Sequence, residues 1–214
     1  MIHLNFKHMR KIISLIFLAV KRCRIYVLSV FITYCISCFI GILMSQIGNE
    51  FALSYRDKIV GKAVKTDNAS INYQKGNQFS AAVIDFSENL FFGAVPQTLM
   101  GFGIVIPYFS AAFQGWVGGI VSVGSDHKSR FTTFKSAFYY FFVLLLQYIP
   151  YSLALGAGIK CGFDFYMNNI KKNWSFWKYK IPKTSLMDVG YVYILVVPLF
   201  FIASCFEFIS TWNI

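Results

Sequence analysis

Three polar side chains inside long apolar runs are the first candidates for function. They are Gln114, Gln147 and Glu207. Polar groups are costly in hydrocarbon, so they usually face a partner or a cavity. Glu207 either lies near the membrane interface or lies deeper, where its carboxylate needs a partner such as Gln114 or Gln147. We expect the two amides to join helices by hydrogen bonds rather than to carry chemistry.

No arrangement of residues typical of an enzyme is present. The three histidines lie outside the apolar runs, and the sequence contains no HExxH, GxSxG or GxxxxGK[ST] pattern. Cys35 and Cys38 form a CxxC inside an apolar run without a nearby histidine or second cysteine pair, which is more typical of packed or lipid-facing thiols than of a zinc or redox site. We therefore expect a protein that is not an enzyme, with no catalytic residue, cofactor or metal.

The composition predicts an all-α, polytopic membrane protein. Of the 214 residues, 57% are apolar and 19% are aromatic, but only 14% are charged. This balance exceeds what a soluble core of this size needs. Four runs carry no charge and are long enough to cross a bilayer, namely 25–49, 89–125, 136–159 and 189–206.

The central charge-free run, 89–125, is too long for one straight crossing. An unbroken helix over its 37 residues would be roughly 55 Å long, against about 30 Å of hydrocarbon. Prolines and glycines interrupt it at Gly93, Pro96, Gly101, Gly103 and Pro107. Small residues continue through Gly115 and Gly119, which favours close packing of two backbones. The sequence predicts a Gly/Pro-rich helical hairpin over 86–124.

The net charge of +11 is distributed unevenly along the chain. Residues 1–24 and 160–188 together hold 12 cations and 2 acids, which marks both segments as cytoplasmic. Nucleic acid is not needed as a partner to explain this basic excess. Both segments lie inside only if the central run crosses an even number of times, so two crossings or a re-entrant hairpin both fit. We expect five spans, with the N-terminus inside and the C-terminus outside.

The expected organisation has eight parts. They are a cytoplasmic amphipathic helix over 1–24, span 1 over 25–47, an extracytoplasmic segment over 48–85, the helical hairpin over 86–124 that provides spans 2 and 3, a short outer loop over 125–135, span 4 over 136–159, a basic cytoplasmic loop over 160–188, and span 5 over 189–212. A cleaved signal peptide is the alternative for the first part, but the apolar run ends in Lys21-Arg22-Cys23-Arg24 rather than in small residues.

Two segments outside the spans offer surfaces for lipid or protein. The outer segment is expected to hold a short interfacial helix over 51–63, followed by a flexible polar loop over 66–79. The inner loop over 163–188 is rich in Lys, Trp and Tyr. That mixture favours a membrane surface, and a docking site for a cytoplasmic partner is the alternative.

Several motifs between residues 86 and 210 resemble the stage II sporulation protein M family. They are Phe86-Ser-Glu-Asn89, Gly101 and Gly103, Gln114-Gly115 followed by Gly119, Gln147 followed by Gly158-Ile-Lys160-Cys-Gly162, and Val196-Val-Pro198 followed by Ala203 and Glu207. The chain departs from the family pattern at three points. Gln114 replaces an Asn, Gln147 replaces a Glu, and Val143-Leu144 replaces a His-Gly pair.

The resemblance implies a prokaryotic cytoplasmic-membrane protein within a multiprotein complex. It adds Asn89, Gly115, Gly119 and Gly158 to the polar residues as candidates for helix packing or partner contacts. Our first hypothesis is a non-enzymatic subunit that scaffolds or localises envelope proteins. The alternative is the permease subunit of an exporter, dimeric and driven by a separate ATPase. Both expect contact with the lipid bilayer, association with other membrane proteins and no nucleic acid. A permease should line a cavity with polar residues, whereas a scaffold should show tightly packed spans.

Overall fold

The structure is a computed structural model that describes residues 2–170 and 180–209. Over these ranges the regular elements are all helical, which confirms the all-α prediction. In chain order they are α1 (Ile2–Gln46), α2 (Glu50–Thr66), α3 (Asn68–Gln74), α4 (Gln78–Ser87), the π-helix η1 (Glu88–Ala94), α5 (Val95–Met100), the 3-10 helix η2 (Gly101–Gly103), α6 (Ile106–Ile120), α7 (Phe134–Ile170) and α8 (Lys183–Ile209).

Three helices of the described part are long and apolar enough to cross a membrane. They cover His8–Gln46, Phe134–Asn169 and Lys183–Ile209. This agrees with a membrane location but not with the expected count of five spans. The difference lies in the central run, because its glycines and prolines divide residues 88–120 into η1, α5, η2 and α6, each shorter than 18 residues.

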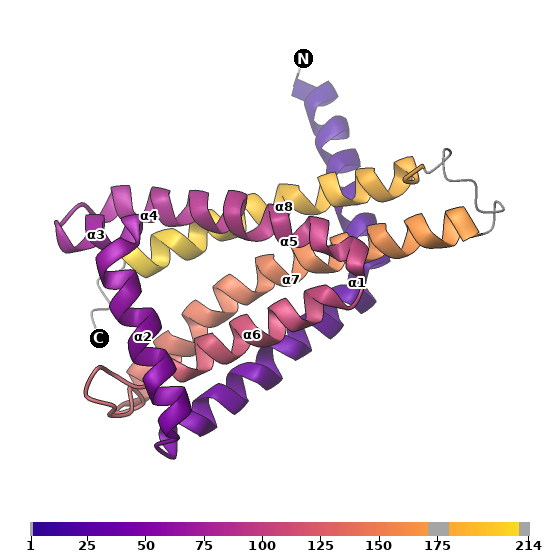
Figure 1. The fold of residues 1–214 in the computed structure, drawn as a ribbon. Coiled ribbons are helices and arrows are strands. Elements are labelled where there is room, and N and C mark those ends of the chain that lie inside the picture. The colour runs from indigo at the N-terminus through magenta and orange to yellow at the C-terminus, as the bar shows by residue number, and fades with distance from the viewer. Residues whose placement is uncertain (1, 171–179, 210–214) are drawn as a thin grey trace.

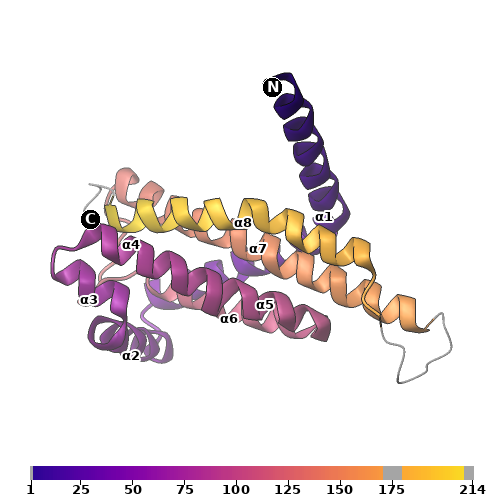
Figure 2. The same cartoon turned by 90° about the horizontal axis from the view of Figure 1, so that it is seen from above.

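Helix α1 is continuous across residues 24 and 25, where we expected an interfacial helix to give way to a span. It bends, however, so that its N-terminal part projects away from the other helices (Figures 1 and 2). On this projecting part Met9, Ile13 and Phe17 form an exposed apolar stripe at four-residue spacing. Ala19 and Cys23 are fully buried in a cluster with α8 residues, so this part of α1 packs against α8.

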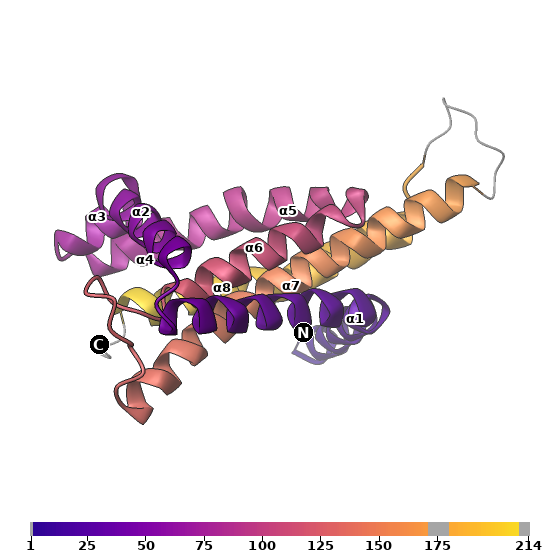
Figure 3. The ribbon, with the colours of Figure 1, turned by 60° about the horizontal axis from the view of Figure 1, so that its bottom comes forward.

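The long helices pack into a bundle with two distinct ends. Helix α1 packs against α6 and α7, and α8 packs against α7 and α4. Helices α4 and α5 run from one end of the bundle toward η2 at the other, and α6 runs back (Figure 1). We call the end that carries α2, α3 and the 121–133 loop the cap end, and the end that carries η2, the C-terminal end of α7 and the N-terminal end of α8 the turn end. Figure 3 shows α2 and α3 lying across the cap end.

Glycines bring helix backbones into direct contact at several places, among them α6 and the turn end. On α6, a Cβ at Gly119 would overlap the Cys38 carbonyl, and one at Gly115 would overlap the Tyr34 carbonyl, both on α1. At the turn end, a Cβ on Gly101 would overlap the Gly158 backbone of α7. The helices therefore approach closely where the sequence supplies no side chain, as membrane helices commonly do.

The cap end is more helical than the sequence suggested. Asn49 begins α2, where its side-chain oxygen accepts a hydrogen bond from Ala52 N at 3.1 Å. The Asp67 carboxylate caps α3 in the same way through Ser70 N at 2.7 Å. The interfacial helix expected over 51–63 therefore exists as part of α2. The prediction of a flexible loop over 66–79 was wrong, because the Asp67 cap starts α3 within this segment.

Candidate functional site

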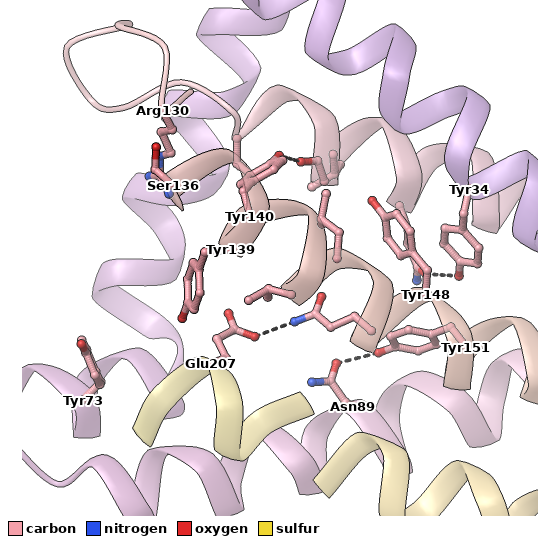
Figure 4. A pocket seen from close by; sticks show the side chains of 17 residues that line it. Tyr34, Tyr73, Asn89, Arg130, Ser136, Tyr139, Tyr140, Tyr148, Tyr151 and Glu207 are labelled. Carbon is pink, nitrogen blue, oxygen red and sulfur yellow. Dashed lines mark hydrogen bonds between the residues drawn. The ribbon is translucent and has the colours of Figure 1, made fainter. Parts of the chain in front are cut away.

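A cavity of about 700 Å³ lies among the helices toward the cap end (Figure 4). Its lining comes from α1, α3, η1, α6, α7, α8 and the loop before α7. It includes all four of the amide and carboxylate candidates from the sequence, which are Asn89, Gln114, Gln147 and Glu207, together with six tyrosines. Pockets for small molecules commonly have volumes of about 300–1,000 Å³, with a few convergent polar groups.

Glu207 and Gln147 form a direct hydrogen bond across the cavity wall. The Gln147 Nε2 of α7 donates to Glu207 Oε2 of α8 at 2.6 Å. Both side chains line the cavity, and Figure 4 shows the position of Glu207. Glu207 therefore has one of the two partners that the sequence suggested for it. Its hydrogen-bond donor is a neutral amide, and the ion pairs found within residues 2–170 and 180–209 lie elsewhere.

Asn89 is held at the cavity by a local departure from α-helix. It lies in η1, whose end has the Val95 N–H bonded to Leu90 O, five residues back. The Tyr151 hydroxyl of α7 donates to Asn89 Oδ1 at 2.6 Å. Tyr151 reaches this position over Gly93, where an added Cβ would overlap its hydroxyl. The glycine thus makes room for the hydrogen bond between η1 and α7.

Gln114 is hydrogen-bonded to a tyrosine in the aromatic part of the cavity lining. The Tyr34 hydroxyl of α1 donates to Gln114 Oε1 of α6 at 2.7 Å. The Tyr34 ring stacks on Tyr148 of α7, with ring centroids 4.8 Å apart and planes 19° apart. Both tyrosines are buried and also line the cavity. Their π-faces and hydroxyls give this wall a mixed aromatic and polar character.

The three glycine candidates lie at contacts between helices rather than in the cavity lining. Gly115 and Gly119 contact the α1 backbone, and Gly158 lies against Thr98 of α5, where a Cβ would overlap the Thr98 carbonyl. None of the three is among the lining residues of the cavity. They position the helices that carry the lining side chains.

Sequence reasoning missed the tyrosines, although a signal for them existed. Ser136, Tyr140, Gln147 and Tyr151 lie on α7 at separations of four and seven residues, which places them on one face of a helix. It also missed the contact of Asp85 with α8, where Ser204 Oγ donates to Asp85 Oδ2 at 2.6 Å.

Charged residues tie three helices together at the turn end. The Arg22 Nε of α1 donates to Asp188 Oδ2 of α8 at 2.8 Å, and the Asp188 side chain is only 2% exposed. Lys160 of α7 pairs with both Asp164 and Asp188. Asp164 in turn accepts from Ser185 Oγ at 2.5 Å. Residues 160 and 188 were expected in a loop, but both lie within helices.

A second charged group links α2 to the 121–133 loop at the cap end. Asp57 Oδ1 accepts from Arg56 Nη1 at 2.9 Å, and Asp57 Oδ2 lies 2.8 Å from His127 Nε2. The hydrogen bonds from Arg56 and His127 hold the pKa of Asp57 below its usual range. Arg130, at the end of this loop, is exposed and lines the cavity.

Neither a metal centre nor a disulfide forms in the part of the chain that the structure describes. No group of three or more His, Cys, Asp or Glu is placed there to hold a metal ion. All five cysteines are free, and Cys35 is exposed while Cys38 is buried. The basic, aromatic stretch of the inner loop, 171–179, lies outside the described residues.

Comparisons of this chain with family models, curated proteins and solved structures found no match.

Proposed function

We propose that the chain is the membrane-embedded subunit of a system that binds and moves a small polar solute, with the cavity as the binding site. The observation that carries this proposal is the convergence of Asn89, Gln114, Gln147 and Glu207 on one cavity of about 700 Å³. Polar side chains at membrane depth are costly, so four of them around one space favour a ligand or a solute path. The chain has no nucleotide-binding motif, so energy would come from a separate ATPase or an ion gradient.

The topology that fits this function is the five-span arrangement with the N-terminus inside a prokaryotic cytoplasmic membrane. In it, α4, η1 and α5 together make one crossing and α6 makes the next, with η2 at the turn. The opposite directions of α5 and α6 support this arrangement (Figure 1). The basic residues Arg22 and Lys160 at the turn end support a cytoplasmic position for that end. The cavity then lies toward the outer face.

Labelling of introduced cysteines tests the binding site directly. Val143 lines the cavity, whereas Leu145 on the same helix is exposed on the outside of the bundle. A thiol reacts as the thiolate, which forms readily in water but not in lipid. In membranes, and with the five native cysteines replaced by alanine, Val143→Cys should react with a small water-soluble thiol reagent much faster than Leu145→Cys. Equal, slow labelling of both positions would mean that water does not reach the cavity, and the proposal would fail.

A scaffold for envelope proteins is the second candidate. It is supported by the close glycine contacts between α1 and α6 and between η2 and α7, which favour a rigid bundle. It is also supported by the helices across the cap end, where Phe79 is 66% exposed. The resemblance to the stage II sporulation protein M family is a further proposal that fits either candidate.

Identification of the proteins that purify with the tagged chain in mild detergent separates the two candidates. A bound ATPase would support the solute-handling subunit and contradict the scaffold. Cell-wall hydrolases bound through residues 48–84 would support the scaffold and contradict the solute-handling subunit. Deletion of 68–77, the segment with α3, offers a control because it should release a scaffolded partner while leaving an ATPase on the cytoplasmic side in place.

A further inference from the structure

Glu207 is the one acidic side chain among the described residues that line the cavity, and none of the ion pairs found in residues 2–170 and 180–209 includes it. Its hydrogen-bond donor is the neutral amide of Gln147 at 2.6 Å. Asp85, a second carboxylate, also has a neutral donor, Ser204, which lies one helical turn from Glu207 on α8. Charged groups away from water are costly unless they are paired. This wall of the cavity therefore suits a positively charged occupant.

The aromatic side chains around the cavity suit the same kind of occupant. Tyr34, Tyr139, Tyr148 and Tyr151 all line it. Tyr139 packs on Phe206, the neighbour of Glu207, with ring centroids 5.5 Å apart, and Figure 4 shows Tyr139 beside Glu207. The negative face of an aromatic ring attracts ammonium groups, and cages of such rings commonly bind quaternary ammonium ligands.

Arg130 is the single basic residue among the lining side chains, and it lies away from this wall. It is exposed and comes from the loop at the cap end, on the far side of Tyr139 from Glu207 (Figure 4). A cation bound at Glu207 would be repelled by Arg130 rather than held by it. Removal of the acidic group of Glu207 should therefore weaken binding of a cation, whereas removal of the Arg130 charge should not.

We propose that the cavity binds a small organic cation, with its ammonium group against Glu207 and the tyrosine rings. This inference rests on the proposed function, because it names the class of solute that the same cavity takes. An ammonium group of this kind fits a cavity of about 700 Å³ with room for a polar tail, for which Asn89 and Gln114 provide amide groups.

Choline and its uncharged carbon isostere, 3,3-dimethylbutan-1-ol, test the charge with little change in shape. Binding of each to the purified full chain in lipid nanodiscs is measured by calorimetry. We expect choline to bind and the isostere to bind at least about tenfold more weakly, since a charged partner adds a factor of this size. Equal binding of the two compounds, or binding of the isostere alone, would overturn the inference.

Four variants locate the binding. Glu207→Gln should weaken choline binding about tenfold or more, whereas the matched control Glu50→Gln, on exposed α2, should leave it unchanged. Tyr139→Leu replaces the aromatic ring by an aliphatic side chain, and it should weaken choline binding several-fold. Arg130→Gln should leave it unchanged or strengthen it. Unchanged binding in Glu207→Gln, or weaker binding in Arg130→Gln, would contradict the placement at Glu207.

The outcome for the inference is separable from that for the proposed function. If neither compound binds while Val143→Cys is still labelled from water, the cavity is a solvated site for another class of solute, and the cation inference alone is overturned. If Val143→Cys is not labelled, the proposed function is overturned together with it.

Discussion

The polar side chains around the cavity are satisfied in pairs that join different helices. Glu207 meets Gln147, Asn89 meets Tyr151, and Gln114 meets Tyr34, at 2.6–2.7 Å. A buried polar group left without its partner costs about 1–3 kcal/mol, which is more than the net gain from an intact hydrogen bond. Each pair therefore constrains how two helices are rotated against one another. Removal of one member should cost more than removal of both.

A double substitution tests this asymmetry at Glu207. Gln147→Leu leaves the carboxylate without its donor, so we expect a loss of about 1–3 kcal/mol in stability and a lower Tm in detergent. Replacement of both residues by leucine should recover most of that loss, because no buried polar group then lacks a partner. A thermal unfolding series on the two single variants and the double variant measures it. A double variant less stable than Gln147→Leu would show that Glu207 is stabilised by other groups.

Among single residues, the sequence selected three that line the cavity, but it left the partner of Glu207 open between Gln114 and Gln147. The cost of polar atoms in hydrocarbon was enough to select Gln114, Gln147 and Glu207. The choice of Gln147 over Gln114 as the partner of Glu207 depends on the rotation of α7 and α8 about their axes. That rotation is set by packing of the whole bundle, which a linear pattern of apolar residues does not specify.

At the scale of the helices, glycines determine how closely neighbouring elements pack. Gly119 lets α6 lie against the α1 backbone at Cys38, and Gly93 lets Tyr151 cross over η1. Both positions lie in the run that the sequence marked as rich in glycine and proline. The same residues explain why the expected spans were not found there, since they break the run into helices of 15 residues or fewer. The close approaches were predictable in kind, whereas the helix that each glycine meets was not.

Substitution of Gly119 should separate α6 from α1. Its added methyl group in Gly119→Ala would overlap a backbone carbonyl that cannot move alone, so we expect a loss of about 1–3 kcal/mol in stability. Gly190→Ala is the matched control, because Gly190 lies in α8 with nothing within 4 Å of an added Cβ. It should be neutral or should raise the Tm slightly, since alanine favours helix. Thermal unfolding in detergent checks both, and a stable Gly119→Ala would contradict the close contact.

Acidification should release the 121–133 loop from α2. The pKa of Asp57 is lowered by its contacts with Arg56 and His127, so its contribution is present above its unfolded pKa of about 3.9 and is lost as pH falls through the lower folded value. Spin labels at Lys58 and Lys128, both exposed, should report a longer or broader distance at a pH below that lower folded value than at pH 7. Asp57→Asn should show the broad distribution at both values. A distance that does not change with pH would show that other contacts hold the loop.

The molecule as a whole has two chemically different ends. The turn end gathers the ion pairs of Arg22, Lys160 and Asp188, and the cap end gathers the contacts of Asp57 and His127. From charge alone the sequence predicts that 1–24 and 160–188 lie on one side, and in the structure Arg22 and Lys160 from these two segments both pair with Asp188 at the turn end. That meeting could be predicted because the positive-inside bias acts on flanking charges and does not depend on how the helices pack. The cavity could not be predicted from the sequence, because its shape depends on the gaps that remain when the helices pack.

Impermeant thiol labelling of intact cells tests the expected orientation. In a chain without native cysteines, Lys128→Cys at the cap end should react with reagent added outside, whereas Lys180→Cys beside α8 should react only after the membrane is opened. Both positions are exposed, so the difference reports the side of the membrane rather than burial. Labelling of both from outside would overturn the even number of central crossings and, with it, the outward position of the cavity.

The bend in α1 has a mechanical consequence for the surrounding lipid. Its projecting arm carries the exposed stripe of Met9, Ile13 and Phe17, which suits burial among acyl chains at one surface. An arm lying in one leaflet adds area to that leaflet and none to the other, and a bilayer relieves such an imbalance by curving. The protein should therefore gather where the leaflet that holds the arm forms the convex side, and vesicles of decreasing radius should take up more of it.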